Sequence, residues 1–493
     1  MRDQQNSYRQ IVKGTSIIGG VQVFTMIISI IRSKFVAVLL GPTGIGIAGL
    51  LTSTISFISG LTNFGLGTSA VRDIASANSI GDEIRISTVI KVLRRWVWIT
   101  GILGTLVMLF FSPWISQLTF GNRDYTLAFI WISITLLFTQ VSSGQLVVLQ
   151  GMRKLQYLAK SSLAGSALGL IITVPLYYQF GVEGIVPAII ISSVVSLILS
   201  WYFAKKVKTE PIKISLASTL IEGKNMVTLG FMISLSMLLA VGVSYVVRIY
   251  ISNTGGVEQV GLYSAGFLII NTYAGLIFNA MGTDFYPRLS EVAHSNELCK
   301  QTINQQAEIA ILILAPILMA FIVFIQWVVI LFYSNKFIAI DTMIHWAAIG
   351  LFFKAASWAI AFILLAKGAS KLFFWNELLA NIYGLGLNIL GYHMLGLTGL
   401  GISFMVSYLL YLIQVYILSK IKYQFSFDTA TIRIFAFQLL LAISCFLVIL
   451  FSEKPYSYIV GTGLIVISSW YSYRELDKRI EIKELLINIK RRF

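Results

Sequence analysis

Charged residues are scarce in this chain of 493 residues. Lys, Arg, Asp and Glu together make up 12% of it, whereas hydrophobic residues make up 57%. Soluble domains carry about 25% charged residues, because their surfaces must be covered with polar groups. The mean hydropathy of +0.82 points the same way. A soluble fold is therefore excluded, and we expect most of the chain to lie in lipid.

Cysteine and histidine are also rare, with two and three residues respectively. Cys299 and Cys445 lie far apart, and neither has a second thiol or a histidine beside it at the spacing of metal ligands. We therefore expect no disulfide framework, no metal site and no cofactor. A G-x-x-x-x-G-K-[ST] loop is absent as well, so this chain does not draw energy from ATP through such a loop.

Long apolar runs dominate what remains. A helix of about 20 apolar residues crosses the hydrocarbon core of a bilayer, and the sequence contains about fourteen such runs. They begin near Lys13, Ile45, Val92, Tyr125, Gln156, Val182, Met226, Val260, Glu308, Thr342, Leu372, Leu397, Arg433 and Tyr456. The fold class is therefore an all-α polytopic membrane protein.

The chain also repeats itself at an offset of about 215 residues. The segment NFGLGTSAVRDIA (63–75) resembles NAMGTDFYPRLSEVA (279–293), and Arg72 and Arg288 occupy similar places in the two copies. Two related membrane bundles commonly hold a substrate between them and rock around it. The repeat therefore favours a transporter over an enzyme, and we expect no catalytic residues.

From these spans we predict five regions along the chain. They are an N-terminal lobe of six helices at 1–207, a cytoplasmic linker at 208–223, a C-terminal lobe of six helices at 224–421, two further helices at 422–473 and a basic cytoplasmic tail at 474–493.

The net charge of +16 follows membrane topology rather than nucleic-acid binding. Most Lys and Arg residues fall at the termini or in the loops of one side, whereas Arg123, Lys336 and Lys454 fall on the other. Positively charged loops stay in the cytoplasm, so both termini are expected there. The loops of the outer side are short, and none is long enough to form a catalytic domain.

Four cationic residues lie inside the predicted spans: Arg32, Lys34, Arg248 and Lys354. A charge in hydrocarbon costs at least about 2.5 kcal/mol, so each is a candidate for substrate binding unless it reaches the interface. Lys354 lies about 18 Å into its span at 1.5 Å per residue, too deep to reach the headgroups easily. For Lys34 and Arg248 an interfacial position is a serious alternative. If at least two of these cations line one cavity, the substrate is an anion.

Arg32 belongs to a polar stripe on the first helix. Gln22, Thr25, Ser29 and Arg32 recur at steps of three, four and three residues, which places them on one helical face. We expect this face to line an aqueous cavity, with the three uncharged residues among its polar lining.

Acidic residues are fewer. Asp284 and Glu377 lie deeper than the others, and either is a candidate to carry a coupling proton or to pair with an internal cation. Asp73 lies beside Arg72, and Glu291 lies near Arg288. At these cytoplasmic helix ends we expect local ion pairs.

Several segments resemble a known family of membrane transporters. They are SKFVAVLLGPTGIGIAGL (33–50), EQVGLYSAG (258–266), FYSNKF (332–337) and AKGASK (366–371). They resemble the Wzx-type flippases for lipid-linked oligosaccharides, which belong to the multidrug, oligosaccharidyl-lipid and polysaccharide exporter superfamily. The branch that is most similar contains the flippases of O-antigen and of enterobacterial common antigen. The resemblance runs from about residue 14 to residue 420.

This resemblance implies two six-helix lobes in a V shape that move an undecaprenyl-diphosphate-linked oligosaccharide from the cytoplasmic to the periplasmic leaflet. It also implies the bacterial inner membrane as the location, with a polysaccharide polymerase and a chain-length regulator as possible partners. Residues matching Lys34, Arg248 and Lys354 are expected in that branch, whereas Arg32 is similar to a cavity arginine of the related lipid II flippases. Two extra helices, near 433–473, depart from its twelve-span members.

Two alternatives stay open. A cation-coupled multidrug exporter of the same superfamily would tend to place carboxylates in a lobe cavity, whereas the deep charges here are mostly basic. A membrane-embedded glycan polymerase or ligase would usually carry long outer loops, and the outer loops of this chain are short.

Overall fold

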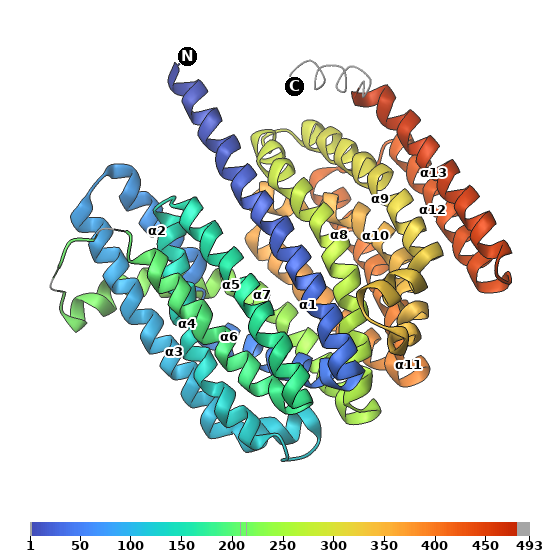
Figure 1. Cartoon of the computed structure of the whole chain (residues 1–493). Helices are drawn as coiled ribbons and strands as arrows, with labels where there is room; N and C mark the ends of the chain where they lie inside the picture. Colours follow the sequence, from blue (N-terminus) through green and yellow to red (C-terminus); the bar gives the residue numbers. More distant parts are fainter. Residues whose placement is uncertain (1, 208, 213, 481–493) are drawn as a thin grey trace. The chain divides into compact units, whose positions relative to one another are not determined.

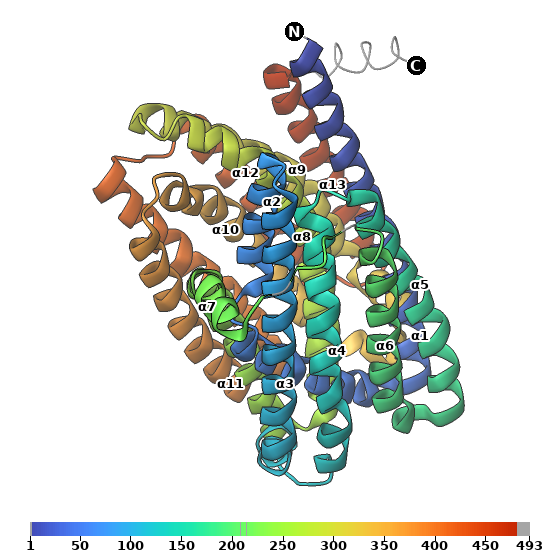
Figure 2. The same ribbon diagram turned by 90° about the vertical axis from the view of Figure 1, so that its left-hand side faces the viewer.

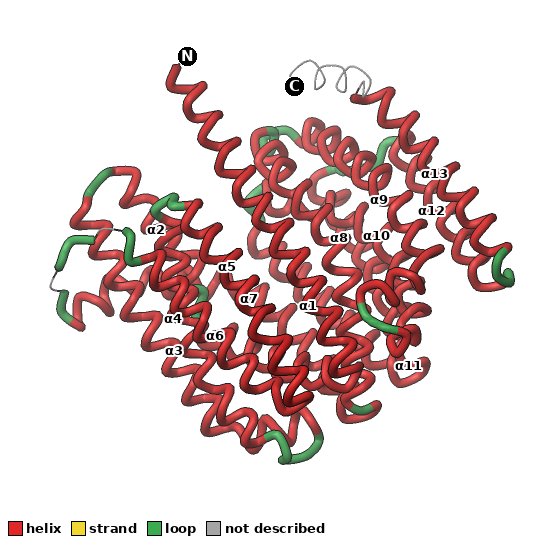
Figure 3. The backbone as a smooth tube through the Cα atoms, viewed as in Figure 1, coloured by secondary structure: helices red, strands yellow, loops and turns green. Residues whose placement is uncertain are grey.

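The computed structural model describes residues 2–207, 209–212 and 214–480. Every regular element in this part of the chain is a helix, and the connecting loops are short (Figures 1 and 3). The α-helices are α1 (Arg2–Thr62), α2 (Leu66–Ile80), α3 (Glu83–Phe120), α4 (Thr126–Gly151), α5 (Leu155–Phe180), α6 (Ile185–Ala204), α7 (Leu216–Gly255), α8 (Val257–Glu291), α9 (Asn296–Phe332), α10 (Asp341–Ala366), α11 (Ser370–Tyr423), α12 (Thr429–Phe451) and α13 (Tyr456–Ile480). Two 3-10 helices, η1 (Gly181–Gly184) and η2 (Asn335–Ile340), connect them.

Nine helical stretches of the described residues are long and apolar enough to cross a membrane. Three of these stretches, Gly20–Thr62, Leu155–Ala204 and Ser370–Tyr423, each cover two of the predicted spans. The prediction of an all-α polytopic membrane protein is confirmed, and the count of fourteen spans stays a prediction.

Local backbone chemistry divides the longest helices. In α1 the break falls at Gly41, whose φ of 67° lies in the left-handed region, and Pro42 follows without an N–H group. In α11 the break falls at Gly396, with a φ of 59°. The second part of α11 then folds back against the first. Gly399 lies so close to Gly391 that a side chain at either position would clash with the other's backbone, so the two glycines permit this close packing.

Several helices begin before the predicted spans. The structure starts α3, α7 and α9 about ten residues ahead of the predicted apolar runs. A helix satisfies its own backbone hydrogen bonds in water as well as in lipid, so it does not need to begin where the membrane does. Residues 474–480 of the predicted tail belong to α13, and residues 481–493 lie outside the described residues.

The chain groups into two compact units. The first unit comprises Met1–Gly261 and Phe332–Ser334, and the second comprises Leu262–Leu331 and Asn335–Phe493. The predicted lobes at 1–207 and 224–421 stay a prediction.

The first unit is a bundle in which α4 packs against α3, α6 and α2, and α5 packs against α1 and α6. Figures 1 and 2 both show α3 beside α4. A core of buried apolar side chains joins α2, α3 and α4, with Ile74, Leu93 and Val148 fully buried. The helix α7 also belongs to this unit, where it packs on α1, α2 and α3.

Side chains of α3 hold the segment that leads into α7. Arg95 donates hydrogen bonds to the backbone oxygens of Ile214 (2.7 Å) and Ser215 (2.9 Å) and to the hydroxyl of Thr219. Lys91 donates to the backbone oxygen of Ile212. These contacts fix the described part of the linker across the first half of α3.

In the second unit α10 packs against both parts of α11 and against α12, and α12 packs against α13. A core of buried side chains from α8, α9, α10 and α11 includes Phe285, Ile303 and Ile360.

The pair α12 and α13 is attached to α9 at two places. In the first half of α9, Glu308 accepts hydrogen bonds from the Thr431 hydroxyl (2.9 Å) and from Nε of Arg479 (2.7 Å). In the last two turns of α9, the Gln326 side chain accepts a hydrogen bond from Lys454. Between these points, Phe324 stacks on Tyr458, with the ring centroids 6.1 Å apart.

Candidate substrate-binding residues

Arg32 is half-buried on α1 in the first unit. Its guanidinium group lies close enough to the Tyr177 hydroxyl on α5 to interact with it electrostatically, and Tyr177 itself is buried. A guanidinium carries five N–H donors, and one hydroxyl oxygen accepts at most two of them. Arg32 therefore has more donors than this neighbour can use and is suited to contact an anionic group.

The rest of the predicted stripe on α1 is polar and accessible. Gln22 and Ser29 are exposed in the structure, and Thr25 is half-buried. The Thr25 hydroxyl hydrogen-bonds to the backbone oxygens of Val21 and Gln22, each at 2.9 Å. Thr25 therefore offers a ligand its oxygen as an acceptor, since its proton is used within the helix.

Lys34 and Arg248 are both half-buried in the first unit. Arg248 donates to the backbone oxygen of Ser244 one turn earlier on α7, at 3.2 Å, and to the Ser244 hydroxyl. The neighbouring Tyr245 is buried and fixes this part of α7, because its hydroxyl hydrogen-bonds to Thr54 (3.1 Å) and Thr119 (2.7 Å).

Lys354 lies on α10 in the second unit, where it is half-buried among aromatic rings. Its Nζ atom is 5.5 Å from the ring centroid of Phe278 on α8 and 5.1 Å from that of Tyr408 on α11. Aromatic faces stabilise a cation by their quadrupoles while leaving its N–H donors unsaturated. The two rings thus position the Lys354 ammonium group inside the bundle and leave its N–H donors suited to an anion.

Glu377 is held by neutral donors within α11. Its carboxylate accepts a hydrogen bond from the Tyr411 hydroxyl at 2.5 Å and one from the Asn376 amide at 3.4 Å. Asn376 is buried and is held in turn by Gln414, which donates to its side-chain oxygen at 2.8 Å and its backbone oxygen at 2.9 Å. Asp284 on α8, by contrast, is exposed.

Sequence reasoning missed the wider polar seam to which Glu377 belongs. On the first part of α11 the residues Glu377, Asn381, Gly384 and Asn388 recur at steps of four, three and four. On the second part Ser403, Ser407, Tyr411 and Gln414 recur at steps of four, four and three. The two stripes face each other in the folded helix pair, and this periodicity is the signal that would have found them.

Two polar atoms of this seam, the Asn388 side-chain oxygen and the Ser407 hydroxyl, are buried without a hydrogen-bond partner among the described residues, as is the hydroxyl of Tyr383 beside Gly384. The seam also reaches Lys354, because the ring of Tyr408 lies between Lys354 and Tyr411, with the two tyrosine centroids 6.5 Å apart. Lys354 and Glu377 therefore belong to one polar region of the second unit.

The expectations for local ion pairs have different outcomes. Arg72 and Asp73 form an ion pair at 3.0 Å, as predicted. The second prediction is wrong, because Arg288 donates to the Gln306 side chain at 3.0 Å and the ion pairs of the described residues do not include Arg288 with Glu291. The helix α9 provides that partner, and helix pairing cannot be read from local spacing.

A search of the described residues for clusters of three or more His, Cys, Asp or Glu side chains finds none that could hold a metal ion. Cys299 and Cys445 are free thiols, and both are buried. The convergence of Arg32, Lys34, Arg248 and Lys354 on one substrate stays a prediction, as do the coupling roles of Asp284 and Glu377.

Comparison with known proteins gives a family and a fold. Residues 35–342 match the model of a family described as polysaccharide biosynthesis protein. A candidate O-antigen transporter of Shigella flexneri is 24% identical over 353 residues, which cover 70% of this chain and 82% of that protein. The lipid III flippase of Escherichia coli K12 is 20% identical over 391 residues, which cover 77% and 90%.

Two solved structures have similar folds. The lipid II flippase MurJ, in an inward closed conformation, matches with a TM-score of 0.70 and 12% identity, covering 93% of this chain and 98% of that chain. An inward-facing multidrug resistance transporter of the MATE family, in the MOP superfamily, matches with a TM-score of 0.68 and 17% identity, covering 83% and 96%.

Proposed function

The chain belongs to the polysaccharide biosynthesis protein family, and from this membership we propose that it is a flippase for lipid-linked oligosaccharides. Its substrate is an undecaprenyl-diphosphate-linked oligosaccharide, such as an O-antigen repeat unit, which it moves from the cytoplasmic to the periplasmic leaflet by alternating access. The observation that carries this proposal is the match of more than half of the chain to the family model. The relatives named as an O-antigen transporter and a lipid III flippase support the same substrate class.

The residues that bind the diphosphate are Arg32, Arg248 and Lys354, with Lys34 as a further contact. A diphosphate loses its water when it leaves the interface, and charge-assisted hydrogen bonds from guanidinium and ammonium groups replace that water. Tyr177 lies close to Arg32, and two aromatic rings position Lys354. Gln22, Thr25 and Ser29 contact sugar hydroxyl groups, for which an accessible polar helix face is suited.

Energy comes from an ion gradient, the membrane potential or the substrate gradient. Glu377 is the stronger of the two coupling candidates, because its carboxylate is half-buried and is held by Tyr411 and Asn376. A change in its charge would therefore rearrange the polar seam that reaches Lys354. Asp284 is exposed and makes a weaker candidate.

The protein acts in the bacterial inner membrane with both termini in the cytoplasm, an orientation that the basic cytoplasmic loops support. It is a transporter and not an enzyme. A polysaccharide polymerase and a chain-length regulator are the partners that would receive its product on the periplasmic side.

The test measures which leaflet holds a fluorescent undecaprenyl-diphosphate oligosaccharide in proteoliposomes. Wild-type protein should expose the lipid on both sides, and Arg32→Ala and Lys354→Ala should each slow the movement by about tenfold or more, as expected for the loss of a charged contact. Lys371→Ala is the matched control, because Lys371 is exposed at the start of α11. Wild-type protein that moves no such lipid but exports a cationic dye would instead identify a drug exporter, and new glycosidic bonds would identify a polymerase.

A further inference from the structure

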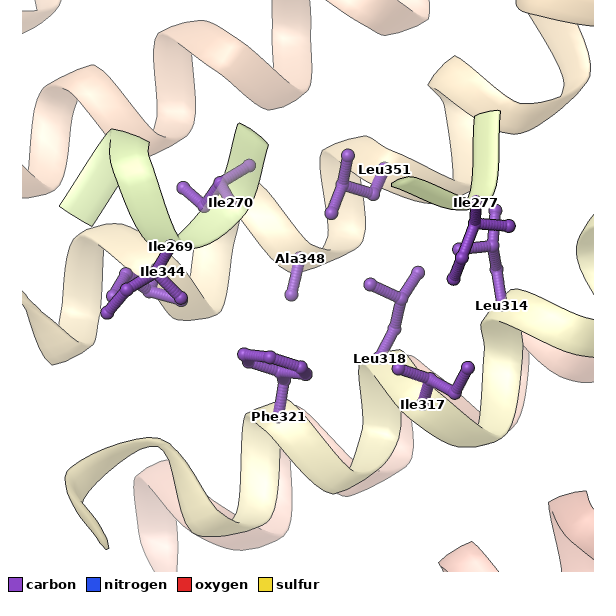
Figure 4. Close-up of a pocket in the computed structure, with 10 residues that line it drawn as sticks. All are labelled: Ile269, Ile270, Ile277, Leu314, Ile317, Leu318, Phe321, Ile344, Ala348 and Leu351. Carbon is purple, nitrogen blue, oxygen red and sulfur yellow. The ribbon is translucent and has the colours of Figure 1, made fainter. Parts of the chain in front are cut away.

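A small apolar hollow lies within the second unit, between α8, α9 and α10 (Figure 4). Its lining consists of Ile, Leu, Phe and Ala side chains, including Ile270 and Ile277 of α8, Ile317 and Phe321 of α9, and Ala348 of α10. In Figure 4 the Phe321 ring on α9 faces the small Ala348 side chain on α10 across the open space. A hollow lined only by carbon attracts hydrocarbon and no polar ligand.

The hollow opens beside α9. Ile317 is 38% exposed, and Ile277 and Phe321 are half-buried, whereas most of the other lining side chains are buried. The helix α9 is one of the stretches apolar enough to cross a membrane, so lipid chains reach this opening.

Lys354 lies near the same hollow on α10, although it does not line it. Leu351, a lining residue, is three positions before Lys354 on α10, so the two lie one helical turn apart. Ile277, also a lining residue, precedes Phe278, whose ring centroid is 5.5 Å from Nζ of Lys354. The arrangement is complementary to an amphiphile with an anionic headgroup and a hydrocarbon chain.

We infer that this hollow holds part of the hydrocarbon chain of the transported lipid while Lys354 contacts its anionic headgroup. The inference rests on the proposed function. Lys354 lies thirteen residues after the first residue of α10, about 20 Å along the helix axis. A phospholipid of the bilayer keeps its phosphate at the interface, whereas a transported lipid brings its phosphates to this depth.

The first test compares two fluorescent carriers with the same diphosphate and sugars, one with an undecaprenyl chain and one with a geranyl chain. Ile317→Trp places a large ring in the opening and should raise the KM for the undecaprenyl carrier about tenfold, while changing that for the geranyl carrier less than about twofold. Ala348→Val, which narrows the hollow from the other side, should give the same selectivity. Ile313→Trp is the matched control, because Ile313 is 37% exposed one turn earlier on α9 and does not line the hollow.

The second test measures photo-cross-linking and does not require transport. A photoreactive diazirine on the polyprenyl chain of undecaprenyl diphosphate should cross-link to α8, α9 or α10 peptides that line the hollow, and Ile317→Trp should reduce this labelling about tenfold. Unlabelled undecaprenyl diphosphate should compete, and phosphatidylglycerol should not.

The inference would be overturned if Ile317→Trp raised the KM equally for both carriers, or if Ile313→Trp had the same effect as Ile317→Trp. Cross-linking of the polyprenyl chain outside the hollow would also overturn it. Competition by phosphatidylglycerol as strong as by undecaprenyl diphosphate would make the occupant an ordinary membrane lipid. If wild-type protein moves neither carrier but the labelling behaves as expected, the proposed transport fails while the chain-binding site stands.

Discussion

Replacing Arg95 should release the segment that leads into α7. The Arg95 guanidinium donates to the backbone oxygens of Ile214 and Ser215 and to the Thr219 hydroxyl, so one side chain holds three acceptors. Hydrogen bonds from a charged donor contribute about 1.5 to 3 kcal/mol each when they are shielded. Because this site is partly exposed and water replaces much of what is lost, we expect Arg95→Ala to cost roughly 2 kcal/mol in local stability.

Hydrogen exchange of the amides in the first turns of α7 measures this cost. A loss of roughly 2 kcal/mol corresponds to about thirtyfold faster exchange when the segment opens locally. Arg85→Ala is the matched control. Arg85 pairs with Glu222 at 2.8 Å, but both side chains are more than a third exposed. Its loss should therefore change exchange less than about fivefold.

Unchanged exchange in Arg95→Ala, or an equal effect of Arg85→Ala, would show that the hydrogen bonds of Arg95 do not hold this segment. The first result would mean that packing of α7 on α3 holds the segment, and the second that net charge rather than the specific hydrogen bonds matters. Trp96 provides such packing, because a side chain added at Gly223 of α7 would clash with its indole ring.

Three further predictions concern the second unit. Glu308→Gln removes one of the two charged partners of Arg479, the other being Glu475, and should raise hydrogen exchange in the last turns of α13 by up to about tenfold, with no comparable change in α10. Tyr411→Phe leaves the Glu377 carboxylate without its closest donor and should destabilise the protein by about 1 to 3 kcal/mol, which a thermal unfolding assay in detergent detects against the exposed control Tyr473→Phe. Lys478 and Arg479 hold the pKa of Glu475 below its ordinary value of 4.5, chiefly through the hydrogen bond from Lys478. Because the folded state favours the ionised carboxylate, its stabilisation is complete above the unfolded pKa and is lost as the pH falls through the lowered folded pKa. A spin label at Tyr473→Cys should therefore keep its mobility from about pH 7 down to the ordinary pKa of 4.5 and gain mobility only below it, and Glu475→Gln should abolish that step.

The fold class was predictable from the sequence because its signal is local. Each apolar run satisfies its own backbone hydrogen bonds as a helix, and about 20 such residues match the thickness of the bilayer. The break at Gly41 and Pro42 is local as well. Glycine adopts a positive φ without strain, and proline lacks the N–H group that a continuous helix needs.

The partners of the candidate residues were not predictable in the same way. Arg32 and Tyr177 meet because α1 packs on α5, and no spacing along either helix indicates that pairing. Arg288 likewise pairs with Gln306 rather than with the nearby Glu291. The two polar stripes of α11 could have been predicted, because both follow the helical period. That they face each other could not be predicted, because this depends on how the two parts of α11 pack.

Because α12 and α13 are attached to α9, we expect the three helices to move together. Hydrogen bonds to Glu308 and Gln326 fix the pair at two places along α9, and Tyr458 stacks on Phe324 between them. We therefore expect a tilt of α9 to move α13 as well, and the exposed side chain of Trp470 lies on α13. A fluorophore placed at Trp470 would consequently report the motion of a helix that lines the apolar hollow, without disturbing that hollow.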